Sequence, residues 1–255
     1  MSRFIRNSYL GMVYLFLYVP IIVVVCFSFN DSQYSLLWHG FSFRWYQVLF
    51  HDADMGIVVM HSFILGVGAA TIGTFLGLIA AINLYRYQFF GKKIMSLMIF
   101  LMIIMPDLIF GISMLLLYGV ASMPLGFFSL LIAHVTFCLP FACVTISNQL
   151  KQLDPHMIEA SRDLGATEWY MYTRLILPLV KPALIASWVL GFTLSIDDVV
   201  ISYFVSGPSF EILPLHIFSM VKMGVSPEIN ALSTLLLVFT VVSVLIAQAR
   251  LRWKS

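Results

Sequence analysis

Three aspartates lie inside long runs of apolar residues, where a carboxylate requires a specific partner. Asp107 follows Pro106, and Asp197 and Asp198 are adjacent in a later apolar run. A charged side chain near the centre of a bilayer costs about 2.5–3.5 kcal/mol even on insertion scales. No Lys or Arg occurs in the outer-half stretches of these runs, which contain the three aspartates. The pattern therefore predicts carboxylates that meet a cation from outside the chain.

Helical rise gives the expected depth of these aspartates. At 1.5 Å per residue, Asp107 lies roughly 20 Å from the basic start of its run, and Asp197 and Asp198 lie roughly 27 Å from Leu179. All three are therefore expected in the outer half of the membrane. Asp198 has a second interpretation, because it could cap a broken helix or hydrogen-bond to Ser195.

Aromatic and acidic side chains near the same surface are further candidates for a substrate path. Trp45 and Tyr203 could face the methylene groups of a ligand or make cation–π contacts with its amines. An aromatic belt at the membrane interface is the alternative explanation for both. Glu211 is predicted either on the path or in an extracellular re-entrant loop.

Composition makes the bilayer the expected solvent of the chain. Of the 255 residues, 61% are hydrophobic and 10% are charged, whereas a soluble domain has roughly 25% charged residues. Apolar runs of about 20 residues predict six membrane-spanning helices in one transmembrane domain, residues 1–255. The expected spans are residues 9–29, 58–84, 94–120, 126–148, 176–204 and 229–249.

The placement of basic residues predicts the orientation. With the N-terminus in the cytoplasm, all of the 14 Lys and Arg residues fall on the inner side except Arg44 and Lys222. This bias follows the positive-inside rule, so both termini are predicted to be cytoplasmic. The small formal net charge of +2 and the lack of a basic stretch interleaved with aromatics give no indication of a nucleic-acid surface.

Patterns typical of catalytic or metal chemistry do not occur in the sequence. The three cysteines lie in apolar runs without metal-type spacing, and we interpret them as core residues. His61 and His134 lie in expected spans, where single histidines usually hydrogen-bond between helices. An ATP-binding P-loop does not occur either.

The polar segment between the fourth and fifth expected spans is predicted to form two short helices joined by a tight turn. Asp154 can cap the first helix, and Pro155 suits its first position. Gly165 can terminate this helix. Thr167 can cap the second helix, with Glu168 near its positive end. Taken alone, the segment also fits an amphipathic helix lying on lipid.

A motif in this segment, residues 149–175 and the start of the next span, is similar to the coupling loop of ABC-importer permeases. The pattern in those permeases is E-A-A-x3-G-x9-I-x-L-P, and here Ser161 replaces the second Ala and Leu175 replaces Ile. The resemblance implies that the segment docks on ATP-binding subunits. The residues implied in ATPase coupling are Glu159, Ala160, Ser161, Leu164, Gly165, Glu168, Leu177 and Pro178.

Most of the chain also resembles the PotC-type permeases of spermidine/putrescine importers. The resemblance is carried by FSFRWY (41–46), LYRYQFFGK (84–92), HVTFCLPF (134–141), FTLSIDDVVISYFVSGPSFEILPL (192–215) and MVKMGVSPEINALST (220–234). It implies an all-α, six-transmembrane-helix type I ABC importer permease that moves a polyamine across the bacterial inner membrane. The candidate path residues are Asp107, Asp197, Asp198, Ser195, Trp45, Glu211 and Tyr203.

The same resemblance implies the partners. They are a second permease subunit (PotB-like), two ATP-binding subunits (PotA-like) and a periplasmic polyamine-binding protein (PotD-like). ATP and Mg are expected on the ATP-binding subunits, and no cofactor is expected in this chain. The chain itself is therefore expected to be a permease subunit and not an enzyme.

Other functions remain open from the residues. An ABC permease for another solute is the nearest, although an oxyanion would favour Arg or Lys in place of the carboxylates. A secondary transporter could use Asp107, or Asp197 and Asp198, for proton coupling. An intramembrane enzyme is disfavoured, because the sequence shows no nucleophile–base pair or metal-ligand motif.

Overall fold

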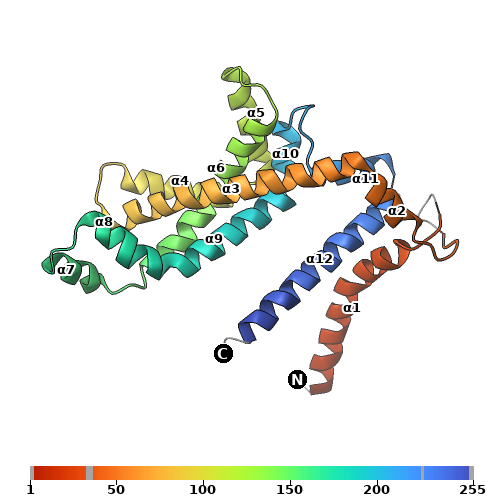
Figure 1. Cartoon of the computed structure of the whole chain (residues 1–255), viewed down its shortest axis with the longest axis horizontal. Coiled ribbons are helices and arrows are strands. Elements are labelled where there is room, and N and C mark those ends of the chain that lie inside the picture. Colours follow the sequence, from red (N-terminus) through yellow and green to blue (C-terminus); the bar gives the residue numbers. More distant parts are fainter. Residues whose placement is uncertain (1–2, 33–36, 225–226, 253–255) are drawn as a thin grey trace. The chain divides into compact units, whose positions relative to one another are not determined.

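The computed structural model describes residues 3–32, 37–224 and 227–252, which form helices joined by short connections (Figure 1). The helices are α1 (Arg3–Phe27), α2 (Arg44–His51), α3 (Ala53–Arg86), α4 (Lys92–Ile104), α5 (Asp107–Val120), α6 (Phe127–Leu150), α7 (Pro155–Asp163), α8 (Glu168–Tyr170), the π-helical η1 (Met171–Ile176), α9 (Leu177–Asp197), α10 (Val200–Val205), α11 (Leu213–Met223) and α12 (Pro227–Arg252). The predicted all-α fold is confirmed.

The chain divides into two compact units. The central unit comprises Val58–Leu215, and the terminal unit comprises Met1–Ile57 together with His216–Ser255. Every candidate path residue except Trp45 and every candidate coupling residue belongs to the central unit.

Several helices in the described residues are long and apolar enough to cross a membrane. Four qualify individually, namely Asn7–Phe27, Ala53–Arg86, Phe127–Leu150 and Glu168–Asp197. The pair α4 and α5 would add a fifth if taken as one broken span, and the apolar part of α12, Pro227–Val242, is shorter. The chain is therefore a multi-pass membrane protein.

Two of the predicted spans are not continuous helices. The expected helix over 94–120 is divided into α4 and α5, whose axes differ by 115°. Pro106 lacks a backbone N–H and disfavours helical geometry at Met105, which is extended with φ −66° and ψ 129°. The predicted depth of Asp107 assumed one straight helix from the start of α4. Because the helix is broken at Met105, that estimate of depth does not hold.

The expected helix over 176–204 is interrupted as well. It ends at Asp197, Asp198 is extended with φ −74° and ψ 121°, and α10 begins at Val200. Both interruptions lie beside predicted path aspartates, so these acids occupy helix termini instead of helix interiors.

Small residues let the helices of the central unit approach closely. Helices α3, α6 and α9 run side by side (Figure 1), and α6 packs against α9. A Cβ atom placed on Gly77 of α3 would lie 2.7 Å from the Cβ of Ala142 on α6. Such contacts between small residues are the usual basis of helix association in membranes.

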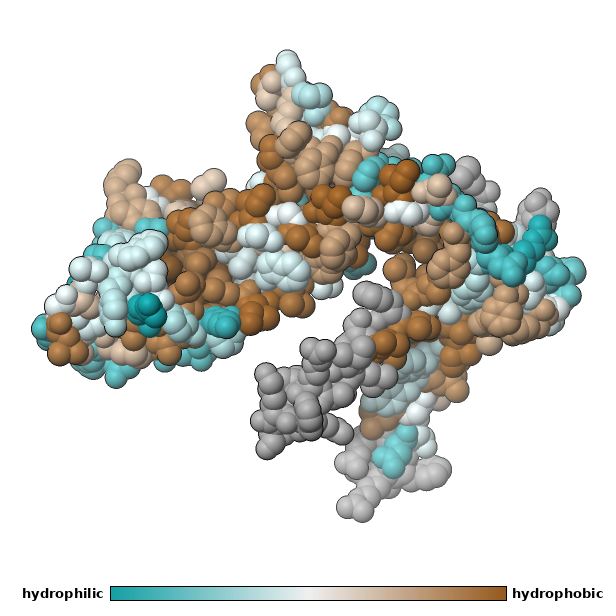
Figure 2. Space-filling view, in the orientation of Figure 1, coloured by the Kyte–Doolittle hydropathy of each residue, from teal (hydrophilic) through white to brown (hydrophobic). Residues whose placement is uncertain are grey.

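The interior of the central unit consists of two apolar clusters. One lies towards the α7 and α8 end and contains Ile146, Met171 and Val180, which are almost fully buried. The other lies around α5, α6 and α10 and contains Leu130 and Ile201. Figure 2 shows apolar side chains covering the visible sides of α3 and α9, whereas hydrophilic side chains concentrate around α7 and α8.

The terminal unit is held by α12, which packs against α1 and α2. Asn30 is fully buried in this unit and pairs in an isolated antiparallel bridge with Phe41. The indole nitrogen of Trp45 donates a hydrogen bond to the Asn30 carbonyl at 2.9 Å. The N–H group of the Trp45 indole is therefore hydrogen-bonded within the terminal unit.

Candidate functional site

A buried polar network joins α6, α9 and α10 in the central unit. His134 on α6 is fully buried; its Nδ1 lies 2.7 Å from the Ser195 hydroxyl on α9, and its Nε2 lies 2.9 Å from the Ser202 hydroxyl on α10. The interpretation of His134 as an interhelical hydrogen-bonding residue is confirmed. Ser202 was not predicted, because a lone serine in an apolar run carries no motif.

Asp198 is the acidic member of this network. Its Oδ1 accepts the Ile201 N–H at 3.1 Å, and its Oδ2 accepts the Ser202 N–H at 2.8 Å and the Ser202 hydroxyl at 2.7 Å. The His134 Nε2 lies 3.6 Å from the same Oδ2. The carboxylate therefore caps α10, as the second interpretation of the sequence proposed, and only 5% of the side chain is exposed.

The neighbouring Asp197 has the opposite environment. It is the last residue of α9 and is exposed, whereas Asp198 one position later points into the protein. Asp107 is also exposed, at the first position of α5, and it lies close enough to Asp198 for their charges to interact. Within the described part of the chain, no Lys or Arg lies within 4.0 Å of any of these three carboxylates.

Close packing of α5 on α10 brings Asp107 and Asp198 together. A Cβ atom on Gly111 of α5 would lie 2.9 Å from the Phe204 ring and 3.2 Å from the Cα of Ile201, both on α10. The two helix breaks identified above thus meet at one place. Tyr203, also on α10, is exposed, and its ring contacts Phe204 edge-on at 5.6 Å between centroids.

The remaining path candidates have surroundings of their own. Glu211 is exposed in the connection between α10 and α11, where its backbone carbonyl accepts from the His61 imidazole at 2.9 Å. The His61 ring stacks on Phe210 at 4.0 Å between centroids. Trp45 is a buried residue of the terminal unit, so the structure does not group it with the aspartates.

The polar loop folds as its local chemistry predicts. The Asp154 carboxylate caps α7 by accepting the His156 N–H at 2.9 Å, and Pro155 is the first residue of α7. Gly165 follows the helix with φ +80°. Its N–H bonds the Arg162 carbonyl, and the Ala166 N–H bonds the Ser161 carbonyl, which together form a Schellman termination.

The second short helix is anchored to the end of α3. The Thr167 hydroxyl caps it by accepting the Tyr170 N–H at 3.3 Å. The Glu168 carboxylate pairs with Arg86, the last residue of α3, and with Arg162 on α7 at 3.0 Å. The sequence alone could not identify the Arg86–Glu168 ion pair, because the two residues are separated by 82 positions.

Large apolar side chains are exposed on this loop. The exposed fractions are 88% for Leu164, 77% for Trp169 and 58% for Tyr170. A depression of about 460 Å³ beside them is lined by the motif residues Ser161 and Gly165 together with their neighbours. Exposed apolar side chains around a concave surface are typical of a protein-binding site.

The other motif residues surround this surface. Glu159 and Ala160 are exposed on α7, and Leu177 and Pro178 are exposed at the start of α9. The hydroxyl of Ser161 donates to the Ile158 carbonyl at 2.8 Å, so the replacement of Ala by Ser is accommodated within the helix. In the described residues, no group of three His, Cys, Asp or Glu side chains is arranged to hold a metal ion.

Comparison with known proteins agrees with this geometry. Residues 73–253 match the family described as "Binding-protein-dependent transport system inner membrane component". The chain is 47% identical over 254 residues to the "Spermidine/putrescine transport system permease protein PotC" of Escherichia coli strain K12, covering 100% of this chain and 96% of that protein. Identity to the Haemophilus influenzae PotC permease is 49% over 249 residues, with 97% of each chain covered.

Solved structures show the same fold at low sequence identity. A bacterial ABC transporter involved in import of the acidic polysaccharide alginate matches with a TM-score of 0.68 and 17% identity, covering 98% of both chains. The alginate transporter in complex with its periplasmic protein matches with a TM-score of 0.73, covering 96% of this chain and 92% of that chain. The family match spans more than half of the chain, and the PotC relatives span nearly all of it. This chain therefore belongs to the family of inner-membrane permease components of binding-protein-dependent ABC importers.

Proposed function

We propose that this chain is the polyamine-translocating permease subunit of an ATP-driven importer. Its relatives named for spermidine and putrescine transport are full-length matches, and a relative named for putrescine transport, PotI of Escherichia coli strain K12, is 44% identical over 229 residues. The carboxylates Asp107 and Asp197 carry the proposal. They are exposed, and no Lys or Arg in the described part of the chain neutralises them.

The charge of the substrate is complementary to these carboxylates. Spermidine and putrescine carry ammonium groups separated by methylene linkers, so two carboxylates on one path would bind one molecule at two points. The exposed ring of Tyr203 on α10 offers a surface for a methylene linker or an ammonium group. Asp198 and Ser195 support this path indirectly, because their hydrogen bonds hold α9 and α10 in position. Trp45 and Glu211 remain candidates for the same path.

The loop centred on α7 and α8 is proposed as the ATPase contact. A folded turn with exposed Leu164, Trp169 and Tyr170 supports docking into a groove of an ATP-binding subunit. That partner binds ATP and Mg and hydrolyses the ATP. Closure of the ATPase pair would pull on α7, and the Glu168–Arg86 ion pair would pass the movement to α3.

The full assembly and its orientation are part of the proposal. It contains a second, PotB-like permease, two PotA-like ATP-binding subunits and a PotD-like periplasmic protein that delivers the polyamine. This chain would contribute six spans with both termini in the cytoplasm, counting α4–α5 and α12 with the four long helices. The location of Arg86, Lys92 and Arg162 on the α7 side supports this orientation by the positive-inside rule.

Uptake measurements test the role of the path carboxylates. Membrane vesicles containing the whole transporter would be supplied with labelled spermidine, putrescine, an amino acid or sulfate, with and without ATP. Asp197→Asn should raise the KM for polyamine by roughly tenfold or more, because a charge-assisted hydrogen bond is lost. Asp54→Asn, which removes an exposed carboxylate from the start of α3, should leave the KM unchanged.

Distinct results would contradict distinct parts of the proposal. Equal polyamine KM values for Asp197→Asn and the unaltered chain would remove this carboxylate from the path. ATP-dependent uptake of sulfate or the amino acid, but not of polyamine, would indicate an importer for another solute. Uptake without ATP by the isolated chain would indicate a secondary transporter.

A further inference from the structure

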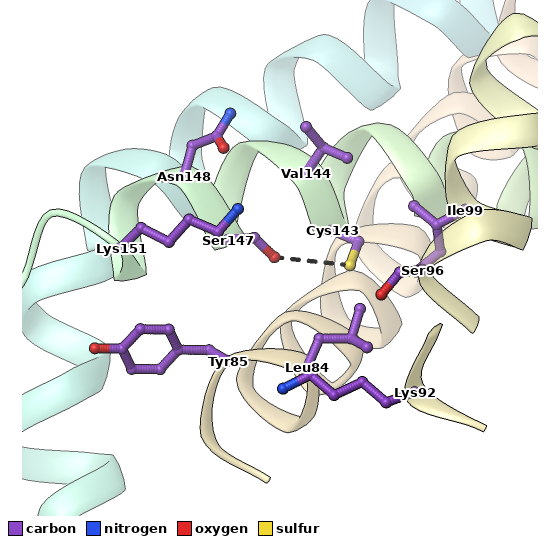
Figure 3. A pocket seen from close by; sticks show the side chains of 10 residues that line it. All are labelled: Leu84, Tyr85, Lys92, Ser96, Ile99, Cys143, Val144, Ser147, Asn148 and Lys151. Atoms are coloured by element: carbon purple, nitrogen blue, oxygen red, sulfur yellow. Dashed lines mark hydrogen bonds between the residues drawn. The ribbon is translucent and has the colours of Figure 1, made fainter. Parts of the chain in front are cut away.

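A second cavity lies in the central unit, at the ends of three membrane helices. It has a volume of about 410 Å³, within the range of small-molecule sites. Its walls come from the last residues of α3, the first two turns of α4 and the last two turns of α6 (Figure 3). Basic residues stand at these helix ends, namely Arg86, Lys92 and Lys151, as expected where membrane helices meet the lipid headgroups on the cytoplasmic side.

The charge of the cavity is positive. Lys92, the first residue of α4, and Lys151, which follows the last residue of α6, both line it, and none of its described lining residues is acidic. The Lys92 ammonium donates to the Tyr87 carbonyl at 3.0 Å, a neutral acceptor that leaves its charge uncompensated. Within the described residues, neither lysine lies within 4.0 Å of a carboxylate.

Neutral donors complement the two ammonium groups. Ser96, Ser147 and Asn148 contribute hydroxyl and amide groups to the lining. Figure 3 shows Lys151 on the side of Ser147 and Lys92 on the side of Leu84, with the open space between them. Two ammonium groups and several neutral donors around one space suit the oxygen atoms of a phosphate group.

The remainder of the wall is apolar. Leu84, Ile99 and Val144 line the same cavity, so a purely ionic ligand would use only part of it. A phospholipid headgroup combines an anionic phosphate with an apolar glycerol–acyl region, and basic pockets between helices at the membrane surface bind such groups. We propose that this cavity binds the phosphate of an anionic membrane lipid.

The site is separate from the proposed polyamine path. A cationic substrate would be repelled by Lys92 and Lys151, and the lining shares no residue with the candidate path. The proposal depends on the membrane location of the chain and not on the identity of its substrate. Because Lys151 begins the connection from α6 to α7, a bound lipid would also hold the base of the coupling loop at the membrane.

Native mass spectrometry of the full chain, purified in detergent with its co-purifying subunits and stripped of lipid, tests the proposal. The probes are dioleoyl phosphatidylglycerol, the zwitterionic dioleoyl phosphatidylcholine and inorganic phosphate. We expect phosphatidylglycerol to bind most tightly. Either Lys92→Gln or Lys151→Gln should weaken its binding roughly fivefold, and the double variant roughly thirtyfold, following the usual contribution of a lysine near anionic lipid.

Lys93→Gln is the matched control, because Lys93 is adjacent to Lys92 but does not line the cavity. Retained phosphatidylglycerol binding in this variant, with loss in the other two, would support the site. Equal binding by all three variants would overturn the proposal, as would equal affinity for the two lipids. Binding of inorganic phosphate without binding of phosphatidylglycerol would also overturn it, and so would occupation of the cavity by a co-purifying subunit in a structure of the complex.

Discussion

The Nδ1 atom of His134 lies 2.7 Å from the Oγ atom of Ser195, although the two residues are 61 positions apart. The other ring nitrogen reaches Ser202 at 2.9 Å, and Ser202 in turn donates to Asp198 at 2.7 Å. One imidazole thus connects the end of α9 to the start of α10 across the break between them. The position of exposed Asp197 depends on this connection.

Replacement of His134 should destabilise the protein without removing any path carboxylate. In His134→Ala, the hydroxyls of Ser195 and Ser202 each lose a buried hydrogen-bond partner. This loss should lower the free energy of unfolding by about 1–3 kcal/mol. The melting temperature of the purified transporter should fall. Thr136→Ala is the control on the same helix, because the Thr136 hydroxyl donates to the Ile132 carbonyl of its own helix at 2.7 Å. Equal melting temperatures for the two variants would show that the network does not stabilise the α9–α10 break.

Gly77 should tolerate no larger side chain. The Cβ of Gly77→Ala would lie 2.7 Å from the Ala142 Cβ and 3.0 Å from the backbone nitrogen of Cys143. Backbone atoms cannot rotate away as side chains can, so α3 and α6 must move apart. The free energy of unfolding should fall by about 1–3 kcal/mol. Thermal unfolding of the purified protein measures this cost.

Gly56 supplies the matched position on α3. A Cβ atom there meets nothing within 4 Å, so Gly56→Ala should be neutral or stabilising by up to about 1 kcal/mol. A stability loss in Gly56→Ala as large as that in Gly77→Ala would indicate that alanine in α3 is harmful regardless of packing.

The backbone conformation of Gly165 should determine whether transport is coupled to ATP hydrolysis by the partner subunits. Gly165→Pro removes the N–H that bonds the Arg162 carbonyl, and its ring cannot adopt φ +80°. We expect an inserted, assembled transporter that has lost most of its substrate-stimulated ATPase activity. Gly165→Asn should keep that activity, because Asn tolerates left-handed geometry and the space around this position is open. Full stimulation in the proline variant would exclude α7 and its turn from coupling.

Features that depend on a few neighbouring residues could be predicted from the sequence. The caps Asp154 and Thr167 and the terminator Gly165 act on backbone groups within four positions, so their types and spacing were sufficient. The long apolar helices α1, α3 and α6 were equally predictable, because each satisfies its own backbone hydrogen bonds in lipid. The family resemblance rested on motifs of the same local kind.

The different environments of Asp197 and Asp198 were decided by tertiary structure. Both are acids in one apolar run, yet only Asp198 meets His134 and Ser202 and becomes a buried cap. The sharp bend after Met105 and the pairing of Arg86 with Glu168 are further examples. Composition and spacing specify which residues form helices and which carry charge. Which carboxylate is buried and which remains available to a ligand depends on contacts between helices far apart in the chain, and these exist only once the helices have packed.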